Sequence, residues 1–121
     1  MEREWYEAVL EAQLVGIAAI RPGITAGEVD EAARSVLHKA KLDRYFTHST
    51  GHGVGLEIHE PPRLGKKQSK RLAPGMVVTI EPGVYVPGKG GIRIEDMVVV
   101  TSTGCEVLTP VTKNLIEMEA A

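Results

Sequence analysis

Residues 76–100 read MVVTIEPGVYVPGKGGIRIEDMVVV, and this stretch decides the fold. Two runs rich in β-branched residues flank a segment of proline and glycine, which is the pattern of a β-hairpin. If the turn is centred near Gly88, then Glu81 and Glu95 lie seven residues away on either side. That register makes the two glutamates direct cross-strand neighbours on one face of the hairpin.

Two carboxylates that face each other in a sheet repel, so this pair needs a compensating partner. A bound divalent cation is the simplest compensation. The alternative places both glutamates on a solvated face, where they cost little. The adjoining runs, residues 76–80 and 97–100, are almost continuously apolar. We therefore expect both strands to be buried on both faces, which favours a metal site.

A second polar cluster precedes the hairpin and contains three imidazoles. His52 lies in the segment GHGVG at residues 51–55, where missing side chains let a ligand approach the backbone closely. His48 precedes it by four residues, and His59 follows in the same segment. A lone histidine is more often structural than a ligand, but three in one short stretch favour a functional site.

The residues before the hairpin predict two helices. Apolar residues recur at helical spacing from about residue 3 to residue 20, where Arg21-Pro22-Gly23 ends the pattern. Thr25 and Glu28 have the spacing of a capping box, so a second helix is expected to run to about residue 40. Asp30 and Asp43, two further acidic residues on or beside this helix, are expected to be surface residues.

These elements predict an α+β fold in which two helices pack on a curved antiparallel sheet. The chain of 121 residues fits a single domain, residues 1–121, with a helical front at 3–40 and a strand-rich metal-site region at 44–118.

The composition excludes several other classes of protein. The chain is 43% hydrophobic and 25% charged, which are ordinary values for a globular domain and not for a disordered one. Its net charge is −2 and its only basic run, residues 63–71, suits a solvated loop, so we expect no nucleic-acid partner. No apolar run is long enough to span a membrane. The single cysteine, Cys105, rules out an intrachain disulfide and favours a cytoplasmic location.

The motifs GHGVGLEIHE (51–60), IEPGVY (80–85) and RIED (93–96), in this order and spacing, resemble the pita-bread metallopeptidases. That family includes aminopeptidase P, prolidase and methionine aminopeptidase, and the last two motifs resemble its Xaa-Pro branch. The resemblance implies the C-terminal half of the pita-bread (creatinase/aminopeptidase-like) fold. It also implies metal-dependent hydrolysis of Xaa-Pro bonds, by an aminopeptidase or a dipeptidase, in peptides with proline in the second position.

The resemblance further implies a metal site. His52, Glu81 and Glu95 would be metal ligands, and Glu95 would bridge two ions of Mn, Co or Zn. Glu81 would also be the base that deprotonates the attacking water.

Four other residues receive roles from the resemblance. His59 would bind substrate and stabilise the tetrahedral intermediate, and His48 would line the substrate pocket or relay protons. Arg63 would contact the substrate, and Arg93 would orient the carboxylates of the metal site.

This sequence departs from the family pattern in one respect. Family members carry two aspartate ligands on strands that precede the first helix, and such a segment does not occur here, so three of five protein ligands are present. We therefore expect the C-terminal part of a catalytic domain with little or no peptidase activity as an isolated chain. Its macromolecular partner would be a second copy or a complementing N-terminal half. The alternative is a non-catalytic peptide-binding or interaction module on the same fold, but the retained ligand residues favour the peptidase.

Overall fold

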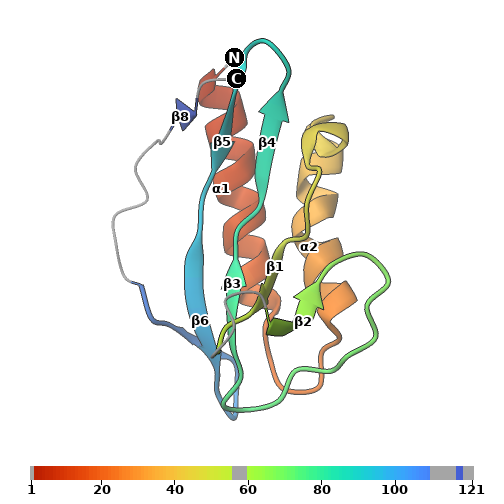
Figure 1. Cartoon of the computed structure of the whole chain (residues 1–121), viewed down its shortest axis with the longest axis vertical. Coiled ribbons are helices and arrows are strands. Elements are labelled where there is room, and N and C mark those ends of the chain that lie inside the picture. The colour runs from red at the N-terminus through yellow and green to blue at the C-terminus, as the bar shows by residue number, and fades with distance from the viewer. Residues whose placement is uncertain (1, 56–59, 110–116, 119–121) are drawn as a thin grey trace.

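The computed structural model describes residues 2–55, 60–109 and 117–118. Helix α1 spans Glu2–Ala19, α2 spans Ala26–Lys39, and a short 3-10 helix, η1, spans Asp43–Tyr45. The strands are β1 (Gly51–Gly53), β2 (Glu60–Leu64), β3 (Val77–Ile80), β4 (Gly83–Val86), β5 (Gly90–Arg93), β6 (Asp96–Val100), β7 (Cys105–Val107) and β8 (Glu117–Met118). Figure 1 shows α1 and α2 behind the strands, which is the α+β arrangement predicted from the sequence.

The strands form two antiparallel sheets, one with the order β2-β1-β3-β6-β7 and one with the order β4-β5-β8. A single long hairpin contributes to both of them (Figure 1). Val77 pairs with Val99 in the first sheet and Gly83 pairs with Arg93 in the second, and each pair is equidistant from Gly88. The predicted hairpin and its register are therefore confirmed. The ladder is interrupted between β3 and β4 and between β5 and β6, and Glu81 and Glu95 occupy these interruptions.

The burial of the hairpin differs from the expectation in one strand. Val78, Thr79 and Ile80 of β3 are all buried, but β6 alternates between buried and half-buried residues, with Met97 and Val99 half-buried. The reason is that the helices cover only one face of the sheet (Figure 1).

The start of α2 follows from its capping box. The Thr25 hydroxyl oxygen accepts a hydrogen bond from the Glu28 amide at 3.1 Å, and the Glu28 carboxylate accepts one from the Thr25 amide at 3.1 Å. These bonds confirm the predicted cap. The bond that the Glu28 carboxylate accepts from the Thr25 amide, with a second from the Thr25 hydroxyl, lowers the pKa of the Glu28 carboxyl. In the part of the chain that the structure describes, no helix has both the length and the apolar composition needed to cross a bilayer.

Two apolar clusters lie between the helices and the strands. The first joins the two helices to the strands of the smaller sheet, through Trp5, Val9, Ala12, Ala33, Leu37, Phe46, Val84, Val86, Ile92 and Ile94. The second packs under the larger sheet and contains Ile20, Ile24, Ala26, Val29, Leu64, Leu72, Val78, Ile80, Val98 and Val100. The hairpin thus passes from one core to the other at the position of its two glutamates.

The expectation that Asp30 is a surface residue is wrong. Its exposed fraction is 1%, and its carboxylate is hydrogen-bonded to Arg34 and Thr50. Asp43, in contrast, is partly exposed, and a hydrogen bond from His38 lowers the pKa of its carboxyl. A charge can be buried when enough donors surround it, and α2 turns Asp30 toward such donors.

One glycine is required by the close approach of two strands. A Cβ atom added to Gly51 in β1 would overlap the carbonyl oxygen of Thr79 in β3. We expect Gly51→Ala to lower the free energy of unfolding by at least about 2 kcal/mol, because the two strands must separate to admit the methyl group. Denaturant unfolding measures this loss.

Gly104→Ala is the matched control. The nearest atom to an added Cβ there is the Ile20 carbonyl oxygen at 3.9 Å, so its free energy of unfolding should stay within about 0.5 kcal/mol of wild type. Equal losses in the two variants would contradict the strand-contact explanation.

Candidate metal and substrate site

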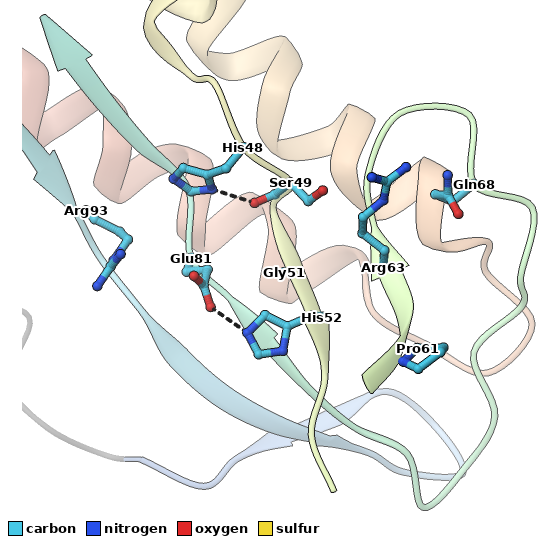
Figure 2. Close-up of a pocket in the computed structure, with 9 residues that line it drawn as sticks. All are labelled: His48, Ser49, Gly51, His52, Pro61, Arg63, Gln68, Glu81 and Arg93. Carbon is cyan, nitrogen blue, oxygen red and sulfur yellow. Dashed lines mark hydrogen bonds and ion pairs between the residues drawn. The ribbon is translucent and has the colours of Figure 1, made fainter. Parts of the chain in front are cut away.

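An open cavity of about 640 Å³ lies beside the interruption in the hairpin. It is lined by His48, Ser49, Gly51, His52, Pro61, Arg63, Gln68, Glu81 and Arg93. Figure 2 shows that these residues come from β1, β2, the loop after β2, both arms of the hairpin and the segment that leads into β1. The volume falls in the range of small-molecule sites, and the lining is mostly polar or charged in type.

His52 and Glu81 lie closest together in this cavity. His52 Nε2 is 3.3 Å from Glu81 Oε2, and the two side chains are 18% and 15% exposed (Figure 2). The contact has the length of an ion pair but not the geometry of a hydrogen bond. Accordingly, Glu81 Oε2 is buried and has no hydrogen-bond partner among the described residues.

The tautomer of His52 follows from its other nitrogen. Nδ1 lies 2.9 Å from the carbonyl oxygen of Gly53, and a carbonyl oxygen can only accept, so Nδ1 is the donor. In the neutral imidazole, Nε2 then carries a lone pair directed at a carboxylate oxygen. Two electron-rich atoms that face each other in a partly buried site favour a cation between them.

The third predicted ligand lies apart from this pair. The hairpin register places the backbone of Glu95 opposite Glu81, but its carboxylate lies 3.7 Å from Arg93 Nε, and both side chains are almost half exposed. Among the residues that the structure describes, no three His, Cys, Asp or Glu side chains lie close enough together to hold a metal ion. The structure thus brings two of the three predicted ligands together.

His48 is held by two hydrogen bonds. Its Nδ1 donates to the Ser49 carbonyl oxygen at 2.7 Å, so its Nε2 is free to accept from the Tyr85 hydroxyl at 3.0 Å. The two rings also lie 5.4 Å apart, centroid to centroid. Partial burial of Tyr85 raises the pKa of its phenol, which keeps the hydroxyl protonated and able to donate.

Of the three remaining predicted residues, two line the cavity. Arg63 lies on β2 and lines the cavity, as does Arg93 on β5. His59 falls outside the described residues, and its predicted role stays a prediction.

The sequence did not single out Tyr85, whose hydroxyl is hydrogen-bonded to His48. It follows Glu81 by four residues in an extended segment, and alternate side chains of a strand share a face, so the signal was present. Its ring lies over Gly91 of β5, where an added Cβ would come within 2.7 Å of the ring. Pro61 and Gln68 carried no comparable signal, because nothing in their local sequence indicates proximity to the histidines.

Comparison with known proteins gives a family match over most of the chain. Residues 1–102 match metallopeptidase family M24. The Xaa-Pro dipeptidase of Pyrococcus furiosus is 50% identical over 115 residues, which is 95% of this chain and 33% of that protein. The chain thus spans about a third of the length of the curated relatives that it matches.

Solved structures match the fold closely. The Xaa-Pro dipeptidase of Bacillus anthracis superposes with a TM-score of 0.91 at 52% identity, covering 94% of this chain and 32% of that one. A dipeptidase of Mycobacterium ulcerans gives a TM-score of 0.90 at 46% identity, covering 93% of this chain and 30% of that one. These matches confirm the family resemblance and the fold that the three motifs predicted.

The raised pKa of Tyr85 makes a testable prediction about alkaline pH. The folded protein holds the phenolic proton of Tyr85 more tightly than the unfolded chain does. The free energy of unfolding should therefore fall as the pH rises above about 10, the pKa of tyrosine in the unfolded chain. The difference in phenolate absorbance between wild type and Tyr85→Phe should therefore titrate with a midpoint above 10. A midpoint at or below 10 would contradict the buried position of the hydroxyl.

Proposed function

This chain belongs to metallopeptidase family M24, and from that premise we propose that it carries part of a metal-dependent site for hydrolysing Xaa-Pro bonds. The observation that carries the proposal is the contact between His52 Nε2 and Glu81 Oε2, in which the carboxylate oxygen is buried without a hydrogen-bond partner among the described residues. The substrate class comes from relatives named Xaa-Pro dipeptidases.

The residues present fit a divalent cation. A neutral imidazole and a carboxylate are ligands that Mn, Co and Zn ions accept, and the Gly53 carbonyl fixes the His52 tautomer with Nε2 toward the site. We propose Glu95 as a further ligand, shared between two ions. A bound divalent ion would lower the pKa of a coordinated water and polarise the peptide carbonyl.

The chain's own residues would accept and transfer protons during cleavage of the scissile bond. Glu81 would accept the proton of the attacking water at its carboxylate. His48 Nε2 accepts from Tyr85, so a proton relay through His48 would run by way of the Tyr85 hydroxyl. We retain His59 as the residue that stabilises the tetrahedral intermediate.

Two arginines would serve substrate and ligand positioning. Arg63 lines the cavity on the side of β2 and would contact the peptide. Arg93 would orient Glu95, and their separation of 3.7 Å supports this role.

We further propose that the 121-residue chain by itself has little activity, since it supplies His52, Glu81 and Glu95 where the family resemblance implies five ligands. A complementing N-terminal half would supply the two aspartates, and a second copy of the chain would be an assembly partner only. The non-catalytic alternative is not favoured, because the relatives that match are named as peptidases or dipeptidases. The lone cysteine agrees with a cytoplasmic location.

Metal binding is the first test. In calorimetric titrations with Mn²⁺, His52→Ala and Glu81→Gln should each weaken binding by at least about tenfold, because each removes a ligand atom. Glu106→Gln, at the exposed position of β7, is the matched control and should bind as wild type does. Glu95→Ala should also abolish or weaken binding, and an unchanged affinity would remove Glu95 from the ligand set.

Catalysis can be tested in a chimera in which this chain replaces the matching third of the Pyrococcus furiosus Xaa-Pro dipeptidase. We expect the chimera to hydrolyse an Xaa-Pro dipeptide with Mn²⁺, and Glu81→Gln to lower kcat by at least about 10²-fold through loss of the base. Glu106→Gln should leave kcat unchanged. A folded chimera without activity, or rapid turnover by the isolated 121-residue chain, would contradict the proposal.

A further inference from the structure

A buried ion pair on α2 lies outside the cavity but is connected to it. Arg34 Nε and Nη2 donate to the two carboxylate oxygens of Asp30 at 2.9 and 3.0 Å, and the side chains are 16% and 1% exposed. Neither residue lines the cavity that contains His52 and Glu81. Burying two charges is costly unless further hydrogen bonds satisfy them, so the destinations of those bonds indicate what the pair does.

The bonds of Asp30 lead to Glu81. Asp30 Oδ1 accepts from the Thr50 hydroxyl at 2.8 Å and from the Thr50 amide at 3.2 Å. The carbonyl oxygen of Thr50, which is fully buried, accepts in turn from the Glu81 amide at 2.6 Å. A continuous path of hydrogen bonds therefore runs from the Asp30 carboxylate to the backbone of Glu81.

The bonds of Arg34 lead to His48. Its Nη1 donates to the Phe46 carbonyl oxygen and its Nη2 to the His48 carbonyl oxygen, each at 3.1 Å. The guanidinium also lies 4.2 Å from the centroid of the Phe46 ring, and that ring meets the His48 ring edge-on at 5.0 Å. The backbone and the ring of His48 are thus both fixed from α2.

The two paths meet on one short segment. Residues 46–50 lead directly into β1, which begins at Gly51. Thr50, the last of them, precedes His52 by two positions and accepts the hydrogen bond from the Glu81 amide. Apolar clusters already hold α2 against the strands. Apolar residues often replace a buried ion pair without loss of stability, so stability alone does not account for these two charges. The hydrogen bonds from the ion pair to two carbonyls, an amide and a hydroxyl are directional. They therefore fix the orientation of residues 46–50 relative to α2, and not only their distance from it.

We propose that Asp30 and Arg34 are positioning residues that hold Glu81 and the His48–His52 segment in register with each other. The part of this inference that concerns metal affinity rests on the proposed function, whereas the part that concerns the Glu81 backbone does not.

Amide hydrogen exchange of the metal-free 121-residue chain tests the inference without any ligand. In Asp30→Asn and in Arg34→Lys, the Glu81 amide should exchange at least about tenfold faster relative to amides of the β4–β5 ladder, because charged hydrogen bonds on the path are lost. Glu31→Gln makes the same carboxylate-to-amide change at an exposed position of α2 and should leave these ratios unchanged. Uniform acceleration of all amides, or no acceleration, would overturn the inference.

Thr50 supplies a milder pair of variants should the α2 variants fail to fold. Thr50→Val removes only the hydroxyl bond to Asp30 and should speed exchange of the Glu81 amide selectively. Thr50→Ser keeps that bond, so its Glu81 amide should exchange at the wild-type rate. Equal rates in these two variants would overturn the inference.

Mn²⁺ titration of the same variants gives a second readout. If wild type binds the ion, Asp30→Asn should bind it about tenfold more weakly, since the support of a ligand is lost, while Glu31→Gln should not. Selective loss of Glu81 protection with unchanged Mn²⁺ affinity would overturn the link to the metal site. If wild type binds no Mn²⁺, the proposed metal function fails, and the exchange ratios still decide whether the pair positions Glu81.

Discussion

The structure depends on the unbroken register of one long hairpin. Its two arms pair about Gly88 in both sheets, so the chain passes from the smaller sheet to the larger without a slip. Each sheet has its own apolar cluster, and the hairpin contributes strands to both clusters, as α2 contributes buried residues to both. Polar side chains are tolerated at the point between the two cores because neither core must bury them fully. Glu81 and Glu95 lie at this point.

The position of the site follows from this arrangement. Where the ladder is interrupted, the backbone of Glu81 is available to the Thr50 carbonyl, which joins the hairpin to the segment before β1. Gly51 permits β1 to lie against β3 so closely that a methyl group would not fit. His52 therefore arrives beside Glu81 because of a contact between backbones, and the Asp30–Arg34 pair supplies the polar bonds that keep this contact in place.

Much of the fold was predictable, since its determinants are local. The helical periodicity of residues 3–20, the capping box at Thr25 and the turn at Gly88 depend on neighbours in sequence, and the structure confirms each of them. The burial of Asp30 was not predictable. An aspartate in an amphipathic helix is expected to be exposed, and its hydrogen-bond partner Thr50 lies 20 positions away in the sequence. The half-buried face of β6 was missed for a similar reason, since an apolar run does not reveal which face the helices cover.

The site divides along the same line. The sequence by itself determined the family, the order of the three motifs and the opposition of Glu81 and Glu95, because motif chemistry and strand register can be counted along the chain. Only the tertiary structure decided that His52 reaches Glu81 while the Glu95 carboxylate lies toward Arg93, that Tyr85 donates to His48, and that an ion pair on α2 is tied to the Glu81 backbone. These contacts join residues from 2 to 37 positions apart, and side-chain direction and helix placement, which set them, arise from packing between elements.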